Sequence, residues 1–159
     1  VPYPPRSFDA ATANQCWLYF DKPATLAELD RVLVQGGLLA ISHVSWLVSD
    51  PIAKATEELV LRVNPAWTGA GFGGDIGPTV PDWARDLVFV GLFAYDEAIP
   101  FTRVTWRGRI RACRGVGASL SDDDVARFDR EHDDLLARIA PERFTVPHRL
   151  DARVFRLPR

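Results

Sequence analysis

The sequence predicts an α/β fold, in which helices pack on a sheet that contains parallel strands. A short strand candidate lies at Phe8–Ala13, and apolar residues at helical spacing follow over Leu26–Leu33. The helical pattern ends at Gln35-Gly36-Gly37, which predicts a helix stop and a tight turn. The near-continuous apolar run Leu38–Val44 then predicts a buried strand. Strand, helix, glycine turn and buried strand in this order predict one right-handed parallel crossover unit.

The rest of the chain continues with helix and strand patterns. Five further elements are expected in the order helix, strand, helix, helix, strand, over Pro51–Val63, Leu87–Ala94, Trp106–Cys113, Asp122–Ile139 and Thr145–Leu157. Asp50 and Ser121 are the expected N-caps of the first and last of these helices. Three aspartates directly after Ser121 favour a helix N-terminus, because they complement the positive end of the helix dipole.

A long loop over residues 64–83 separates two of these elements and holds five of the eleven glycines. Loops of this length inside a domain are usually functional or mobile, so we expect a substrate loop or lid. Residues 69–74 match the pattern G-x-G-x-x-G. A dinucleotide cradle needs a strand before the glycines and a helix after them. Here a helix precedes them and Asp75-Ile76-Gly77-Pro78 follows, so a flexible loop is favoured over a nucleotide site.

Composition excludes several classes of protein. The chain has 159 residues with 47% hydrophobic and 25% charged, which is typical of a single globular domain spanning 1–159. A net charge of −2 gives no general attraction to nucleic acid or to an anionic membrane, and no apolar run is long enough to span a bilayer. Cys16 and Cys113 are far apart and are expected as reduced thiols of a cytoplasmic protein. With three scattered histidines, they predict no metal site.

The sequence contains no methionine, so Val1 is not an ordinary initiator. Processing, an alternative start codon and a fragment of a longer protein each account for this. The proline-rich opening, Val1-Pro2-Tyr3-Pro4-Pro5, resembles a loop entering a strand and favours the fragment.

The three histidines have different expected roles. His43 falls at the carboxyl end of a predicted strand, where open α/β sheets place their ligands, and is the best candidate for a general base. The alternative for His43 is a hydrogen bond to a neighbouring loop. We expect His132 to be exposed on the acidic helix and His148 to form a structural hydrogen bond.

Five arginines lie close together without an intervening acid, at Arg103, Arg107, Arg109, Arg111 and Arg114. They are compatible with a grip for phosphate or carboxylate. A solvated helix face, with Trp106 and Ile110 turned inward, is the favoured interpretation.

Two motifs carry a resemblance to a known family. Residues 7–17 (SFDAATANQCW), with Phe20-Asp21 after them, resemble the fourth-strand motif of class I S-adenosylmethionine-dependent methyltransferases. Residues 31–41 (RVLVQGGLLAI) are similar to the R-V-L-x-P-G-G turn and fifth strand of that family, with Gln35 where proline is usual. Residues 106–111 and 147–149 resemble the tail of small-molecule members of the type 11 kind.

The resemblance implies a Rossmann-like seven-stranded sheet of order 3-2-1-4-5-7-6, of which this chain supplies only strands four to seven. The first strand, its glycine-rich cofactor loop and the acidic residue that holds the ribose are missing from this set. The strand at Phe8–Ala13 then becomes a bare edge, which invites pairing with another chain. We therefore expect a homodimer, a swapped segment or an N-terminal piece along this edge.

The resemblance also implies a site. Residues just after the fourth strand line the methionine end of S-adenosylmethionine, and here they are Asn14, Gln15, Cys16 and Trp17. The alternative for Trp17 is a core anchor. The substrate side is expected after the fifth strand, with His43 as base and with aromatic walls for a small-molecule acceptor from Trp46, Trp67, Phe72 and Trp83. The alternative for Trp67, Phe72 and Trp83 is packing beneath a long loop.

Three functions remain open from the sequence. The leading one is methyl transfer to a small molecule by the C-terminal part of a longer enzyme. The second is a truncated, non-catalytic relative that dimerises or binds a partner or ligand. The third is an unrelated α/β module, and cofactor binding separates the first from the other two.

Overall fold

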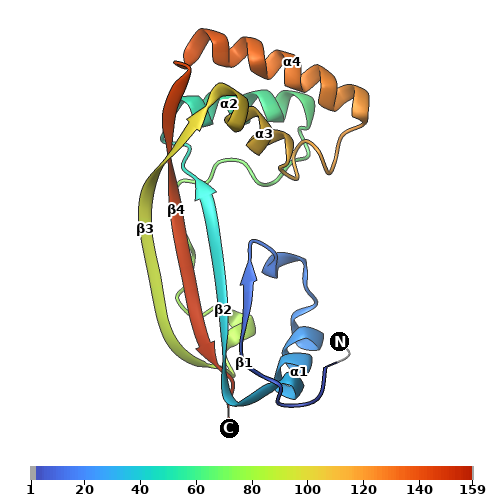
Figure 1. The fold of residues 1–159 in the computed structure, drawn as a ribbon, viewed down its shortest axis with the longest axis vertical. Coiled ribbons are helices and arrows are strands. Elements are labelled where there is room, and N and C mark those ends of the chain that lie inside the picture. The colour runs from blue at the N-terminus through green and yellow to red at the C-terminus, as the bar shows by residue number, and fades with distance from the viewer. Residues whose placement is uncertain (1–2, 159) are drawn as a thin grey trace. The chain divides into compact units, whose positions relative to one another are not determined.

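A computed structural model describes residues 3–158 and contains one four-stranded sheet in the order β1-β2-β4-β3 (Figure 1). The strands are β1 (Phe8–Asn14), β2 (Leu33–Trp46), β3 (Val88–Thr102) and β4 (Arg143–Arg156). β1 and β2 are parallel, with Ala10 opposite Leu38 and Asn14 opposite Ser42. The helix α1 (Lys22–Val32) connects them, which confirms the predicted crossover unit.

Three further helices follow, namely α2 (Pro51–Val63), α3 (Arg103–Arg111) and α4 (Asp122–Ile139). The predicted N-caps are confirmed. The Asp50 carboxylate accepts from the backbone N–H groups of Ile52 and Ala53 at 2.9 Å. Ser121 Oγ accepts from the backbone N–H of Asp124 at 3.2 Å. Short 3₁₀ turns lie at Trp17–Tyr19 and Asp82–Ala84.

The sequence predicted a turn between helix and strand at the glycine pair, and this prediction is wrong. β2 begins at Leu33, directly after α1, and the glycines lie inside the strand at an irregularity of its pairing. Leu33 is opposite Phe8 and Leu38 is opposite Ala10, so extra residues of β2 bulge from the ladder. Gly36 has a φ of +72°, a conformation that glycine adopts without strain.

β3 and α3 also differ from their predicted bounds. β3 continues beyond Ala94 through two acidic residues and Pro100 to Thr102. It is the last strand in the sheet order, and an edge strand tolerates charges and proline. α3 begins at Arg103, not near Trp106, because Thr102 and Thr105 form a capping box.

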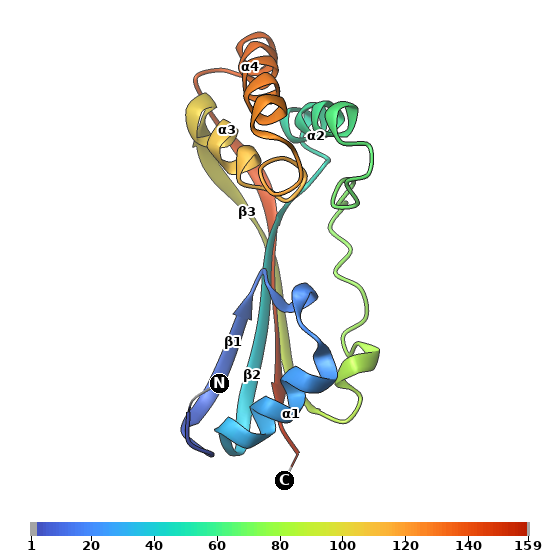
Figure 2. The ribbon, with the colours of Figure 1, turned by 90° about the vertical axis from the view of Figure 1, so that its right-hand side faces the viewer.

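The chain divides into two compact units. The first unit comprises the described residues up to Val44, residues 76–95, and the described residues from Arg149. In both views α1 lies beside β1 and β2 of this unit (Figures 1 and 2). Its core contains Ala13, Trp17, Leu33, Leu39, Ile41 and Leu157.

The second unit comprises residues 45–75 and 96–148. α4 packs against both α2 and α3, and the three helices gather together in Figure 2. Its core includes Leu59, Trp106, Ile110, Phe128 and Leu136. Among residues 3–158, no helix combines the length and the apolar composition needed to cross a membrane.

Candidate functional site

The candidate site lies where β1 and β2 end, in the first unit. Ser42 Oγ donates to the side-chain oxygen of Asn14 at 3.3 Å. The backbone N–H of Gln15 donates to the Ser42 carbonyl at 2.9 Å, and its side-chain amide donates to the Val44 carbonyl. Gln15 has a φ of +59°, so the chain leaves β1 by a left-handed residue held against the end of β2. Carboxyl ends of parallel strands are where α/β sheets bind ligands.

The predicted cofactor residues differ in exposure. Asn14 and Gln15 are exposed, and Cys16 is half-buried at the start of the 3₁₀ turn. An amide side chain offers both donors and an acceptor, so the first two residues are able to bind a carboxylate or an amine.

Trp17 is buried in the core of the first unit, as the alternative interpretation predicted. The residue is 5% exposed, and its ring packs 4.9 Å from Trp83 and 5.9 Å from Phe20, measured between ring centroids. Trp83 packs in turn on Phe155 at 5.4 Å. The indole N–H of Trp17 is buried and has no hydrogen-bond partner among residues 3–158. A tryptophan N–H only donates, so this position is suited to an acceptor atom.

His43 lies near the end of β2 and faces a carboxylate from β4. Its Nδ1 is 3.4 Å from Oδ1 of Asp151, and the side chains are 31% and 4% exposed, respectively. An ionised carboxylate only accepts hydrogen bonds, so Nδ1 is the donor and Nε2 of the neutral imidazole holds the lone pair. This is the arrangement of a histidine able to accept a proton at Nε2.

Asp151 is also paired with Arg153, two residues further along β4. Arg153 Nη1 donates to the same Oδ1 at 3.0 Å, and its Nη2 donates to the carbonyl of Ile76. Sequence reasoning missed both residues, because it followed the apolar positions of this strand. The available signal is a charged pair at i and i+2, which places both side chains on one face of an otherwise apolar strand.

The remaining predicted substrate residues belong to the second unit. Trp46 is buried, and its indole N–H donates to Glu57 Oε1 at 2.6 Å. Trp67 is partly buried against the core. Phe72 is half-buried, and its carbonyl accepts from the backbone N–H of Val48 at 3.1 Å. Trp46 lies in the core of this unit and Trp67 packs against that core. The role of these two residues and of Phe72 toward a substrate stays a prediction.

The glycine pattern at residues 69–74 has the context expected of a loop. Residues 64–81 contain no helix or strand, and Gly71 has a φ of +83°. Its backbone N–H donates to Glu57 Oε2 at 2.7 Å. A helix N-terminus does not follow, so the dipole that a nucleotide cradle needs is missing here.

Arginines of the run form ion pairs, hydrogen bonds and a ring contact within the second unit. Trp106 and Ile110 are buried, as the solvated-face interpretation predicted. Arg107 pairs with Asp129 and Asp133, each at 2.7 Å, and the bond to Asp129 raises the pKa of Arg107. Arg109 stacks over the Trp46 ring at 4.8 Å. Arg103 donates to the carbonyl of Ala140, so these arginines brace the helices.

The prediction that His132 is exposed is wrong. His132 is fully buried, and its Nε2 is 3.2 Å from Thr56 Oγ1, which also accepts from the Trp106 indole N–H at 3.1 Å. Burial lowers the pKa of His132 to about 4. The prediction for His148 is confirmed, because its buried Nδ1 lies 2.9 Å from the Val146 carbonyl.

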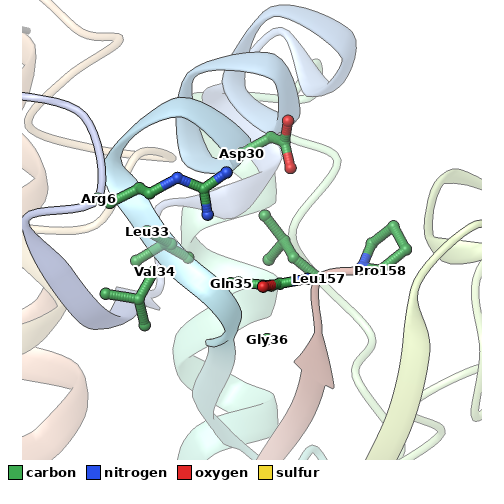
Figure 3. A pocket seen from close by; sticks show the side chains of 8 residues that line it. All are labelled: Arg6, Asp30, Leu33, Val34, Gln35, Gly36, Leu157 and Pro158. Atoms are coloured by element: carbon green, nitrogen blue, oxygen red, sulfur yellow. The ribbon is translucent and has the colours of Figure 1, made fainter.

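A pocket of about 530 Å³ lies at the other end of β2. Its lining residues are Arg6, Asp30, Leu33, Val34, Gln35, Gly36, Leu157 and Pro158. Figure 3 shows Arg6 and Asp30 extending over it. It contains none of the predicted site residues and lies at the amino end of the parallel pair, opposite the end where such sheets bind ligands.

Comparison with known proteins finds a family model that matches the first quarter of the chain. Residues 1–41 match the family model described as a methyltransferase domain. No curated protein matches the sequence.

Several solved structures match nearly the whole chain. A proposed type II methyltransferase from Anaeromyxobacter dehalogenans matches 99% of this chain and 68% of its own, with a TM-score of 0.55 and 20% identity. A proposed methyltransferase from Bacillus halodurans C-125 matches 100% of this chain and 74% of its own, with a TM-score of 0.48 and 15% identity. Phosphoethanolamine N-methyltransferase 2 of Haemonchus contortus, solved with phosphomonomethylethanolamine and S-adenosylhomocysteine, matches 99% and 35%, with a TM-score of 0.40 and 15% identity.

The family model covers β1, α1 and β2 as far as Ile41, so Asn14 and Gln15 lie within the match and His43 lies beyond it. The Anaeromyxobacter structure extends the likeness of fold to the four-stranded sheet. Residues 1–41 are therefore similar to a methyltransferase domain, and the chain as a whole shares the mixed α/β fold of the Anaeromyxobacter structure.

Proposed function

We propose that this chain takes part in S-adenosylmethionine-dependent methyl transfer to a small-molecule acceptor, as the C-terminal part of a longer enzyme. The observation that carries the proposal is the strand order β1-β2-β4-β3 with β1 parallel to β2. The family resemblance implies the order 4-5-7-6 for its last four strands, and the two orders agree when β1 is taken as the fourth strand. The family model matches the residues that contain β1 and α1.

The residues at the end of β1 fit one part of the cofactor. Asn14 and Gln15 present exposed amides, and Trp17 presents a buried N–H without a partner among the described residues. These groups are suited to the carboxylate and amine of the methionine end. Residues 3–158 offer no strand, glycine loop and helix in succession for the nucleoside end, so that part belongs to the proposed remainder of the enzyme.

When bound, S-adenosylmethionine supplies an electrophilic methyl group on a sulfonium. The task of this chain is to align the acceptor for in-line displacement and to remove a proton where the acceptor is a hydroxyl or an ammonium. His43 Nε2 is the proposed proton acceptor, because Nδ1 is committed to Asp151. Asn14 and Gln15 orient the cofactor side.

We assign the acceptor side to Trp83, which lies in the first unit with His43. The roles of Trp46, Trp67 and Phe72 toward an acceptor stay predictions. Trp83 belongs to the loop over residues 64–83 and is half-buried. In this proposal the Trp83 ring supplies an apolar wall for a small acceptor.

Titration calorimetry with S-adenosylmethionine and S-adenosylhomocysteine tests the proposal. The 159-residue chain and any longer product read from its gene upstream of Val1 are both titrated. Trp17→Phe keeps an aromatic side chain and removes the indole N–H, so affinity is expected to fall roughly tenfold, about 1.4 kcal/mol, and circular dichroism checks that the fold is retained. Gln35→Ala is the matched control for Gln15→Ala, because Gln35 lies at the amino end of β2. Absence of binding by every form, or equal loss in both glutamine variants, would overturn the proposal.

A second candidate function, a non-catalytic module that self-associates, is favoured by the exposure of β1. This strand is at the end of the sheet order, and most of its residues are exposed. An open edge of this kind pairs with a second copy, through Phe8–Ala13. Light scattering tests this candidate with the β1 variant Ala10→Lys/Thr12→Lys and with Ala24→Lys on α1 as its control. If two copies pair through β1, the β1 variant becomes monomeric and the control does not. A monomeric unmodified chain would exclude this candidate.

A further inference from the structure

We propose that Asp151 and Arg153 are positioning residues for His43, which hold its imidazole in the Nδ1–H tautomer and link it to the loop at Ile76. The inference rests on the proposed role of His43 as a base. It adds two residues of β4 that neither the sequence motifs nor the family match include, since that match ends at residue 41.

The carboxylate of Asp151 decides which imidazole nitrogen carries the proton. His43 Nδ1 is 3.4 Å from Asp151 Oδ1, and Asp151 is buried. The carboxylate offers only acceptors, so the contact requires a proton on Nδ1. The lone pair is thereby placed on Nε2, in a side chain that is 31% exposed and thus open to a reactant.

Arg153 fixes the carboxylate itself. Its guanidinium donates to the same oxygen that His43 contacts, at 3.0 Å, and both partners of this ion pair are buried. A buried ion pair loses as much hydration as it gains in attraction, so it is a weak source of stability. It is an effective source of orientation, because the guanidinium binds in a fixed plane and direction.

The other end of the guanidinium reaches the loop. Arg153 Nη2 donates to the carbonyl of Ile76, within the loop over residues 64–83. One side chain therefore contacts both the carboxylate that orients His43 and the backbone of the proposed substrate loop. A change in the loop at Ile76 is expected to reach His43 through Arg153 and Asp151.

The tautomer of His43 tests the inference directly. Long-range ¹H–¹⁵N spectra of the full 159-residue chain, at about pH 9, report neutral histidines, well above their usual titration range. The His43 signals are assigned from their absence in His43→Gln. We expect Nδ1–H for His43 in the unmodified chain.

The second part of the test removes both partners of the Asp151–Arg153 ion pair at once. Asp151→Leu/Arg153→Met avoids leaving one buried charge unpaired, which protects the fold. His43 is expected to lose its Nδ1–H signal and gain an Nε2–H signal. His148, whose Nδ1 faces the Val146 carbonyl, serves as an internal control that stays unchanged. Asp9→Asn, at an exposed carboxylate of β1, is the matched control variant.

An Nε2–H tautomer in the unmodified chain would overturn the inference, and so would an Nδ1–H tautomer that persists in the double variant. The result is independent of methyl transfer. If the tautomer behaves as expected and no form binds the cofactor, the positioning inference stands and the proposed function fails.

Discussion

The indole N–H of Trp46 donates a 2.6 Å hydrogen bond to a carboxylate oxygen of Glu57, and both residues are buried in the second unit. The other carboxylate oxygen accepts from the backbone N–H of Gly71 at 2.7 Å. Two hydrogen bonds therefore offset part of the cost of burying this charge. The pair also attaches the glycine-containing loop to α2.

Substitution of Glu57 should destabilise the second unit. Glu57→Gln replaces one acceptor by a donor that faces an N–H group, which costs about 1–3 kcal/mol of unfolding free energy. Glu57→Leu leaves both N–H groups without a partner and costs about 3 kcal/mol or more. Urea unfolding measures both. The control is Glu58→Gln, at the exposed neighbouring position, which should change stability by less than about 0.5 kcal/mol.

His132 should make stability depend on pH. Burial lowers its pKa to about 4, against an ordinary value of 6.5, so the folded chain binds fewer protons than the unfolded chain between these values. Stability therefore rises with pH through this window and is lost as pH falls from 6.5 toward 4. Through His132 the free energy of unfolding is about 3 kcal/mol higher above this pH window than below it.

His132→Gln isolates this effect, because glutamine can bond to Thr56 and does not titrate. Chemical unfolding at several pH values should give a shallower slope for the variant between pH 4 and 6.5. Equal slopes would show that His132 is not buried in its neutral form.

The glycines of β2 should not tolerate a side chain. Gly36 has a φ of +72°, so Gly36→Ala costs about 1–2 kcal/mol. At Gly37 a Cβ atom would lie 2.9 Å from the Val34 carbonyl oxygen and 3.2 Å from that of Asp9. Backbone atoms cannot yield as side chains do, and Gly37→Ala should cost about 1–3 kcal/mol.

Gly108 is the matched control for these two glycines. It lies in α3, and a Cβ atom there would meet nothing within 4 Å. Gly108→Ala should therefore stabilise the chain by up to about 1 kcal/mol, because alanine favours the helix. Thermal unfolding of the three variants checks the order, and a destabilising Gly108→Ala would contradict the packing described for α3.

The Asp151–Arg153 pair should show strong coupling. Either single substitution, Asp151→Leu or Arg153→Met, leaves one buried charge unpaired and costs about 3–5 kcal/mol. The double variant should cost far less than the sum. A double-mutant cycle by urea unfolding measures the coupling, and additive effects would argue against a buried ion pair.

Local signals allowed much of the fold to be predicted. Asp50 with Pro51, and Ser121 with three aspartates after it, predicted the starts of α2 and α4, because capping depends on residues only two or three positions apart. The glycines at Gly36 and Gly37 were recognised as special, yet they form a bulge and not a turn. Pairing of β2 with β1 extends past them, and pairing is not visible in a local pattern.

The candidate site could be predicted only in part, because contacts between distant parts of the chain are not visible in a local pattern either. The end of β1 follows from the family motif over residues 7–17, and His43 follows from its place near the end of a predicted strand. The burial of His132 was missed, because the charged residues around it on α4 suggested a solvated helix. Its partner Thr56 lies on α2, and their meeting depends on how α2 and α4 pack.

The sequence by itself determined the alternation of strands and helices, the helix caps and the resemblance of residues 7–17 and 31–41 to methyltransferases. These depend on short-range spacing and on residue type. Only the tertiary structure decided that Asp151 and Arg153 lie beside His43 and Ile76, and that the Trp17 N–H has no partner among the described residues. Contacts between positions 43 and 151 arise from sheet order, which places β4 next to β2 although about a hundred residues separate them in the chain.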